Sequence, residues 1–253
     1  MARAALPGGL IAADRLVWRL ATVREIVRET GTAKSLVLDV PDWAGHRPGH
    51  HLDVRLTAED GYQAQRSFSI ASPPEQSAVT LTVERIDAGE VSPYLVDDVI
   101  VGDELEVRGP VGGPFTWAVG DGGPLLLVAG GSGLVPLMAM MRHRAAAGSG
   151  LQARLLVSAR TDAAALYGDE LDRLSADPGV EVGRTFTREP PAGWHGWTGR
   201  VDAGMVTALG PPADAHPRIF VCGPTGFVEA VSDLLVDAGH EPASIRTERF
   251  GPS

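Results

Sequence analysis

The stretch PLLLVAGGSGLVPLMAMMRHRAAAG, residues 124–148, decides the fold of the second half of the chain. It begins as a continuous apolar run of strand length, turns at a cluster of glycines, and continues with helical composition to Gly148. This order predicts a buried strand, a tight turn and a helix. The alternation continues downstream, with strands expected at 152–160, 180–189, 218–224 and 245–250 and helices at 164–177 and 225–238. Strands that alternate with helices form βαβ units, so we expect a parallel sheet.

The glycine cluster of this stretch is a candidate ligand site. Gly130, Gly131 and Gly133 let the backbone turn sharply and approach a bound group. Free amides at a helix start suit a phosphate, and Ser132 can add a hydroxyl. The pattern is not GxGxxG and has no Walker lysine, so a turn that only joins strand to helix is the alternative interpretation.

The first half of the chain has a different character. Short strand signals separated by Gly, Pro or Asp occur at 18–30, 33–40, 50–56, 66–72, 78–86 and 103–112, with a short helix expected at 91–99. Several short strands at this spacing indicate a barrel or a sandwich. The composition changes near 112–123, which predicts a tail at 1–15, a first domain at 16–118 and a second at 119–253.

Composition excludes several classes of protein. The chain has 253 residues, 44% of them apolar, and a formal net charge of −10, which disfavours a general nucleic-acid surface. Its single cysteine, Cys222, can form neither a disulfide nor a four-cysteine iron–sulfur cluster within this chain. The adjacent His50 and His51 would point to opposite faces of a strand, so no metal site is expected. No apolar run reaches transmembrane length and the start has no signal-peptide core, so we expect a cytoplasmic protein.

The segment RSFSIASPP, residues 66–74, places an arginine at the start of a strand in an acidic chain. Ser67 and Ser69 flank the aromatic ring of Phe68. One interpretation is an edge strand with a solvated face. The other is a strand that holds a flat, charged ligand, with Arg66 as the partner of the charge.

Two further segments carry candidate residues. In DAGEVSPYL, residues 87–95, Ser92 is expected to be the N-cap of the short helix, and a capped helix start would offer amides to a second phosphate. In VCGPTGF, residues 221–227, Cys222 stands at the carboxyl end of an expected parallel strand, the edge at which open α/β sheets bind ligands. A buried, inert cysteine is the alternative.

Together these segments resemble the ferredoxin–NADP reductase family. RSFSIAS is similar to the family's Arg-x-Tyr-Ser flavin motif, with Phe68 in place of tyrosine. PGHHLDVRL resembles the preceding strand, and GEVSPYL with GDELEVRGPVGGPF resembles the flavin pyrophosphate segment and the strand after it. GGSGLVPLMAM and CGPTGF resemble its nicotinamide-domain motifs. The motifs occur in the family's order over roughly residues 16–253. The resemblance implies an antiparallel β-barrel FAD domain followed by an α/β parallel-sheet nucleotide-binding domain.

The resemblance also implies roles for individual residues. Arg66 would neutralise a flavin phosphate, Phe68 would lie against the isoalloxazine, and Ser69 would sit near its N5 edge. The other implied FAD and NADPH contacts are Ser67, Gly89, Val91, Ser92, Gly130, Gly131, Ser132, Gly133, Cys222, Gly223, Pro224 and Phe250. Ser69, Cys222 and Glu248 are the expected catalytic residues, Glu248 by tuning protonation near the flavin, although a charged strand end would equally explain it.

Coenzyme choice rests on the segment TFTREPPAGWHGWTGR. It has Thr187 and Arg188 where NADPH-using relatives carry a hydroxyl–arginine pair for the 2′-phosphate, and Arg160 is a second candidate. The alternative is a solvated surface arginine.

The expected function is that of an FAD-dependent NADPH reductase that passes electrons to a separate one-electron acceptor: a ferredoxin, a flavodoxin or an oxygenase component. A reductase of free flavin or ferric chelates, or a non-catalytic flavin-binding regulatory subunit, would use the same sites.

Overall fold

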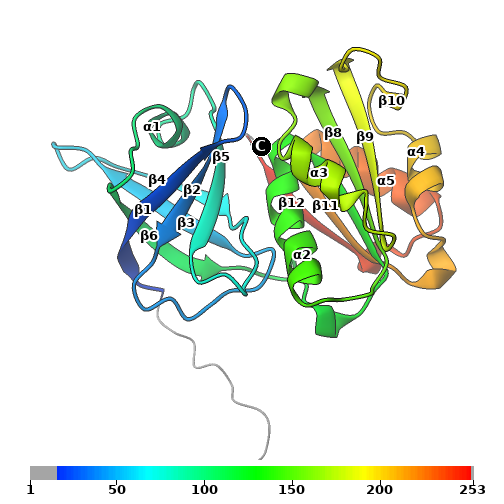
Figure 1. The fold of residues 1–253 in the computed structure, drawn as a ribbon, viewed down its shortest axis with the longest axis horizontal. Coiled ribbons are helices and arrows are strands. Elements are labelled where there is room, and N and C mark those ends of the chain that lie inside the picture. Colours follow the sequence, from blue (N-terminus) through cyan, green and yellow to red (C-terminus); the bar gives the residue numbers. More distant parts are fainter. Residues whose placement is uncertain (1–15, 252–253) are drawn as a thin grey trace, which may run out of the picture.

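The computed structural model describes residues 16–251, so the tail expected at 1–15 lies outside the described residues. Two domains lie side by side, with the first half of the chain forming one and the second half the other (Figure 1). The antiparallel barrel and the parallel α/β sheet that the sequence indicates are both present. Within the described residues no helix is both long enough and apolar enough to cross a membrane.

The first domain is a six-stranded antiparallel barrel. Its strands are β1 (Trp18–Arg28), β2 (Ala33–Asp39), β3 (His51–Thr57), β4 (Gln63–Ser69), β5 (Val79–Glu84) and β6 (Glu104–Val111), in the spatial order β4-β3-β6-β1-β2-β5. A bridge between Ile70 and Leu81 joins the two end strands and closes the barrel. Inward-facing side chains such as Leu36, Leu52 and Leu81 are fully buried, which is the alternation expected of such strands.

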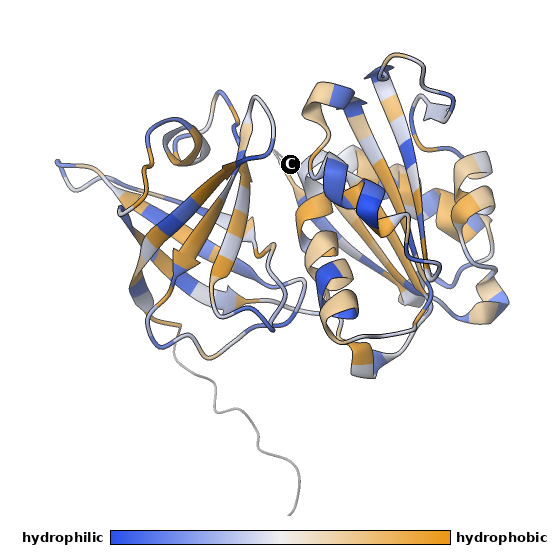
Figure 2. Ribbon diagram, in the orientation of Figure 1, coloured by the Kyte–Doolittle hydropathy of each residue, from blue (hydrophilic) through white to orange (hydrophobic). Residues whose placement is uncertain are grey.

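The second domain is a six-stranded parallel sheet with helices on both faces. Its strands are β7 (Leu125–Gly130), β8 (Ala153–Thr161), β9 (Val180–Glu189), β10 (Trp197–Thr198), β11 (Arg218–Pro224) and β12 (Ile245–Phe250), in the order β10-β9-β8-β7-β11-β12. The helices are α2 (Leu134–Ala146), α3 (Gly168–Leu174), α4 (Ala203–Leu209) and α5 (Thr225–Asp237). The central strands are hydrophobic along their length because both faces are covered (Figure 2).

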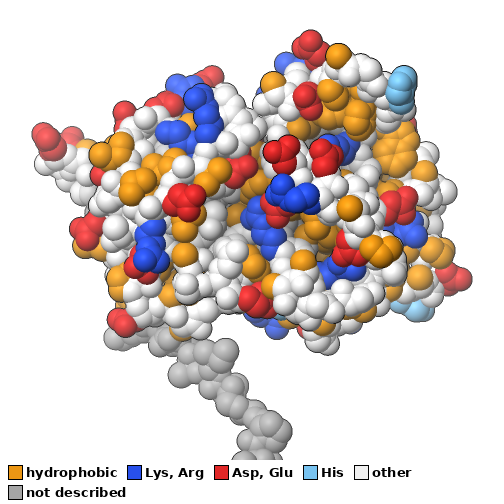
Figure 3. Space-filling model, in the orientation of Figure 1, with side chains coloured by type: hydrophobic (Ala, Val, Ile, Leu, Met, Phe, Trp, Pro, Cys, Tyr) orange, Lys and Arg blue, Asp and Glu red, His pale blue; other side chains and the backbone are white. Residues whose placement is uncertain are grey.

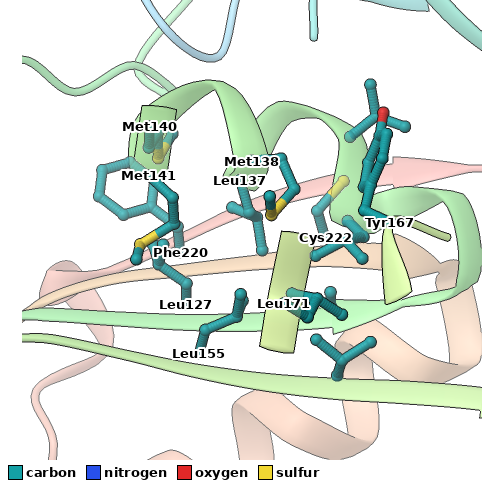
Figure 4. Close-up of a cluster of buried hydrophobic side chains, with 14 of the residues drawn as sticks. Leu127, Leu137, Met138, Met140, Met141, Leu155, Tyr167, Leu171, Phe220 and Cys222 are labelled. Atoms are coloured by element: carbon teal, nitrogen blue, oxygen red, sulfur yellow. The ribbon is translucent and has the colours of Figure 1, made fainter. Parts of the chain in front are cut away.

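Two separate hydrophobic layers hold these helices to the sheet. On the barrel side, α2 and α3 pack on the sheet around Leu127, Leu155 and Phe220, with methionines of α2 filling the space between them (Figure 4). On the far side, α4 and α5 pack on a second cluster that includes Leu126 and Ile219. The barrel-side cluster also contains Ala33 and Ala71 of the first domain, so the two domains share a core.

The structure corrects three expectations about local elements. The helix expected at 164–177 is only α3, because Tyr167 adopts a left-handed backbone at φ 57 and a short 3-10 turn precedes it. α4 and β10 were not expected, since seven and two residues are too short for a clear periodic signal. Short 3-10 turns occur at Val119–Asp121, Gly131–Gly133, Asp162–Ala164, Ala213–Ala215 and Pro242–Ser244.

Ser92 is not the N-cap of α1 (Ser92–Asp97), contrary to the sequence-based expectation. Val91 holds that position without a side-chain cap, and Ser92 is the first helical residue. The Ser92 hydroxyl instead accepts a hydrogen bond from the Ile86 backbone amide at 3.1 Å. It therefore fastens the turn that leads into the helix, because the turn brings Ile86 back over it.

Candidate cofactor site between the two domains

The carboxyl ends of three parallel strands gather candidate residues from distant parts of the sequence. In the strand register Cys222 of β11 lies beside Ala129 of β7 on one side and Glu248 of β12 on the other. Pro224 pairs with Phe250, so β11 and β12 end at the same level of the sheet. This is the edge at which ligands bind in open α/β sheets.

The glycine turn packs tightly against this edge. A Cβ on Gly133 would lie 2.2 Å from the Cys222 carbonyl oxygen, and one on Gly130 or Gly223 would lie within 2.8 Å of the Phe227 ring. These three glycines are therefore required for packing of the turn on β11. Gly131 differs, because it is exposed, has φ +56, and a Cβ built there would have no neighbour closer than Glu84 Oε2 at 4.0 Å. Together with half-buried Ser132 it forms the accessible part of the turn, which fits a phosphate.

Half-buried Glu248 and buried Cys222 lie side by side at this edge. Burial raises the pKa of Glu248 to about 7, and its Oε2 has no hydrogen-bond partner among the described residues. Burial, and then the charge of Glu248, raise the pKa of the Cys222 thiol well above its usual value. A buried carboxyl oxygen without a partner fits a polar group of a bound ligand, because buried polar atoms are otherwise paired. The thiol stays protonated and is not poised as a nucleophile.

β4 supplies the residues of the barrel side. Phe68 is half-buried and packs at the edge of the barrel core, on the same face of the strand as exposed Arg66. Among residues 16–251, the Arg66 guanidinium donates only to the neighbouring Gln65 carbonyl, at 2.6 Å, and lies 4.0 Å from Glu90. Half-buried Ser69 ends the strand, next to the Ile70 bridge. This arrangement leaves the exposed guanidinium of Arg66 available to an anion at the surface of β4.

The structure does not bring Ser67 to the same face as Arg66 and Phe68. Its hydroxyl donates to Asp53 Oδ1 at 2.6 Å, and Arg108 binds the other oxygen of that carboxylate at 2.6 Å. Because successive strand residues point to opposite faces, Ser67 belongs to the outer surface of the barrel. Its side chain is held by this ion pair, and its backbone remains available to a ligand.

The turn before α1 lies next to Arg66. Gly89 donates its amide to the Ile86 carbonyl at 2.8 Å, and Val91 and Ser92 follow as buried residues. Glu90 in the same turn accepts a hydrogen bond from the Tyr62 hydroxyl at 2.9 Å. Sequence reasoning missed Glu90 and Tyr62, because their contact depends on barrel closure.

A groove of about 550 Å³ continues from this turn, lined by Leu56, Tyr62, Ala64, Glu90 and Tyr94 among others. Its largely apolar lining and flanking tyrosines suit a flat ring beyond a phosphate at Arg66. A second hollow of about 690 Å³ lies at the amino edge of the parallel sheet, next to Asp121 and Arg246, away from the gathered residues.

Arg160 and Arg188 lie at the carboxyl ends of neighbouring strands β8 and β9. A bulge between Ala159–Phe186 and Thr161–Glu189 separates the paired residues there. Both arginines are exposed, and neither forms an ion pair or a side-chain hydrogen bond within residues 16–251. Exposed arginines at the ends of two neighbouring strands, with half-buried Thr187 next in sequence to Arg188, suit a phosphate.

An aromatic pair that the sequence analysis did not single out borders these arginines. The Phe186 and Trp194 rings meet edge to face at 5.0 Å, and the Trp194 indole donates to the Trp197 carbonyl at 2.9 Å. The spacing of the tryptophans in GWHGW was the available signal, but only the fold of the loop shows that they support β9.

The glycine turn faces β5 of the barrel across the domain seam. A Cβ built on Gly131 would lie 4.0 Å from Glu84 Oε2 of β5, and Phe250 packs against the core cluster shared by both domains. Figure 3 shows the two lobes and the hollow at one end of the seam between them. The architecture thus defines a two-domain protein in which a barrel with an exposed arginine on β4 packs against a parallel α/β sheet.

Comparisons with known proteins agree with this class. The chain matches the model of the oxidoreductase FAD-binding domain over residues 19–116 and that of the oxidoreductase NAD-binding domain over residues 127–233. It therefore belongs to the ferredoxin–NADP reductase family of FAD- and NAD-binding oxidoreductases.

Individual relatives are similar over most of the chain. The glycine betaine monooxygenase reductase subunit of Chromohalobacter salexigens is 29% identical over 233 residues, covering 90% of this chain and 62% of that protein. The ferredoxin reductase component of 3-ketosteroid-9-alpha-monooxygenase from Mycobacterium tuberculosis is 32% identical, covering 84% and 60%. The chain thus spans about three fifths of the length of these relatives.

A solved structure gives the corresponding similarity of fold. The FAD/NAD-binding domain of nitric oxide dioxygenase from Vibrio cholerae superposes with a TM-score of 0.82 at 25% identity, covering 92% of this chain and 99% of that one.

Proposed function

We propose that this protein is an FAD-dependent reductase that accepts a hydride from NADPH and passes the electrons singly to a separate acceptor. The observation that carries the proposal is the strand register that sets Glu248 beside buried Cys222 at the sheet edge, where the glycine turn contacts β5 of the barrel. FAD, when bound, supplies the chemistry that converts a two-electron hydride into single-electron steps. The chain supplies binding, orientation and protonation.

Each domain binds one nucleotide in this proposal, with boundaries at 16–118 and 119–253. Arg66 binds a flavin phosphate, together with backbone amides of the turn at Gly89, Val91 and Ser92. Phe68 provides a flat apolar surface for the ring system, and Ser69 provides a hydroxyl beside it. Phe250 covers the ring from the other domain. The family matches at 19–116 and 127–233 support this division of labour.

Glu248 and Cys222 organise the reacting region. With a pKa of about 7, Glu248 exchanges its proton near neutral pH and can either donate or accept a hydrogen bond there. The buried Cys222 thiol remains neutral and holds the neighbouring ring by packing. Gly131 and Ser132 bind the coenzyme pyrophosphate, while Gly130, Gly133, Gly223 and Pro224 shape the turn that presents them.

NADPH is the proposed coenzyme, since Arg160 and Arg188 stand unpaired beside Thr187 at the edge where an adenosine ribose would lie. The 2′-phosphate distinguishes NADPH from NADH, and two guanidinium groups can bind it. We infer an oxygenase component, a ferredoxin or a flavodoxin as the acceptor, in the cytoplasm. The relatives named as monooxygenase reductase components support the first of these.

The test is the absorbance spectrum of the purified protein, before and after addition of NADPH without oxygen. A flavin spectrum that bleaches with NADPH, followed by reoxidation on addition of ferredoxin, supports the proposal. Turnover with free FMN or a ferric chelate but not with ferredoxin would identify a reductase of small molecules. Bound flavin that neither NADPH nor NADH reduces would contradict the enzymatic function and favour a regulatory subunit.

A further inference from the structure

A continuous chain of buried hydroxyl groups crosses the seam between the two domains. The Tyr167 hydroxyl donates to Thr82 Oγ1 at 2.5 Å, Thr82 lies 2.7 Å from Ser35 Oγ, and Ser35 donates to Glu29 at 2.5 Å. Tyr167, Thr82 and Ser35 are each less than 7% exposed. Because Ser35 gives its proton to Glu29, Thr82 must donate to Ser35 and accept from Tyr167. Each hydroxyl therefore donates to the next group, and the hydrogen bonds all run in the same direction, from Tyr167 to Glu29.

An arginine of the second domain makes a parallel connection. Arg142 of α2 binds both oxygens of Glu170, at 2.8 and 2.5 Å, and its remaining terminal nitrogen donates to the Ala71 carbonyl at 2.8 Å. Its guanidinium carbon lies 4.7 Å from the centre of the Tyr167 ring. Glu170 and Tyr167 therefore fix the plane of the guanidinium, and its fork reaches the barrel in one orientation.

The backbone of Tyr167 shows that this placement is imposed by the fold. Tyr167 has φ 57, a left-handed conformation that costs a non-glycine residue free energy. Its side chain joins the core beside Leu171 and Cys222, with the hydroxyl directed out of the cluster (Figure 4). The unfavourable backbone is retained where the ring must be buried and its hydroxyl must reach the other domain.

The two connections join elements whose relative position matters for the proposed reaction. Ala71 follows two residues after Ser69 of β4, and Arg142 lies on the helix that the glycine turn opens. Thr82 is on β5, which contacts that same turn. We propose that Tyr167 and Arg142 are positioning residues. They hold the glycine turn at a fixed place relative to β4, the strand that carries the proposed flavin contacts, and thereby set the rate of hydride transfer. This inference rests on the proposed function.

The test compares single hydrogen-bond deletions with a matched control in the FAD-loaded protein. Tyr167→Phe and Thr82→Val remove the interdomain hydrogen bond and retain most of the buried volume, and Arg142→Lys keeps the charge but loses the fork. Thr207→Val makes the same chemical change as Thr82→Val at an exposed position of α4, where the hydroxyl makes no side-chain hydrogen bond within residues 16–251. Rapid mixing with NADPH gives the limiting rate of flavin reduction and the coenzyme Kd separately.

We expect Tyr167→Phe and Arg142→Lys to lower the limiting rate on the order of 10-fold to 100-fold, because small errors in position are costly for transfer between bound groups. The coenzyme Kd should change by less than about 3-fold, since neither side chain is placed at the coenzyme phosphates. Thr207→Val should match the wild type. A limiting rate that stays at the wild-type value in Tyr167→Phe, with a lower Tm, would overturn the inference and leave a structural role only.

Small-angle X-ray scattering of the oxidised protein gives a readout that needs no coenzyme. The double variant Tyr167→Phe with Arg142→Ala should have a larger radius of gyration than the wild type, because both polar connections across the seam are gone. An unchanged radius would count against the inference. If neither NADPH nor NADH reduces the wild-type flavin, the proposed function fails, and the scattering result alone then decides whether these residues position the domains.

Discussion

The ionisation of Glu248 should make the protein less stable as the pH rises towards neutrality. Its pKa is 4.5 in the unfolded chain and about 7 in the folded protein, because the carboxyl is buried. Between these values the folded state keeps a proton that the unfolded state has released, so stability falls through this window and is constant above it. The loss is about 3 kcal/mol, since one pKa unit corresponds to about 1.4 kcal/mol.

The variant Glu248→Gln isolates this effect, because an amide has a similar shape and does not ionise. At about pH 4 both proteins carry a neutral side chain, and their free energies of unfolding should be similar. At about pH 8 the variant should be more stable than the wild type by about 3 kcal/mol. Other carboxyl groups contribute equally to both proteins and cancel in the difference.

The assay is urea unfolding followed by circular dichroism from about pH 4 to about pH 9, at one fixed concentration of FAD in all samples. Glu229→Gln, which replaces an exposed carboxyl on α5, measures the effect of the amide substitution itself. A difference between Glu248→Gln and wild type that stays constant over this range would refute the reasoning, because it would mean that the Glu248 carboxyl has the same pKa in the folded and unfolded protein.

Three further substitutions test the nucleotide sites. Arg66→Ala should raise the Kd for FAD on the order of 10-fold to 150-fold, because a phosphate loses a charged hydrogen bond, and unchanged flavin titration would contradict this. Arg188→Ala should lower kcat/KM for NADPH by a similar factor while that for NADH changes little, with Arg218→Ala at the opposite sheet edge as control. Equal losses with both coenzymes would show that the 2′-phosphate does not bind at Arg188. Cys222→Ala should slow flavin reduction in stopped flow and leave FAD bound, whereas an unchanged rate would assign Cys222 to packing alone.

Much of the architecture could be predicted from local sequence patterns. The apolar run at 125–130 and the glycines after it are a local signal, and the structure has β7, the turn and α2 there. Strand and helix periodicity depends only on neighbouring residues, so it is present in the sequence before any tertiary contact forms. The order of the motifs also sufficed to identify the family that the comparisons show.

The local signals failed where a tertiary contact decided the conformation. Ser92 is a residue type that is common at N-caps, yet its hydroxyl accepts a hydrogen bond from the Ile86 amide, because the preceding turn folds back over it. The helix expected at 164–177 is shortened because Tyr167 leaves the helical backbone and places its ring in the core. In both places packing outweighs propensity, which is worth only fractions of a kcal/mol per residue.

The sequence by itself determined most of the strands and helices, their order, and which residue types are available at the proposed nucleotide sites. Only the tertiary structure decided that Glu248 lies beside Cys222 and becomes hard to ionise, since this depends on β12 pairing with β11. It also decided that Tyr167 reaches Thr82, 85 positions away, and that Arg142 reaches Ala71. The contacts of Tyr167 and Arg142 with the barrel leave no periodic pattern in the sequence. Each forms only when the two domains dock in one arrangement.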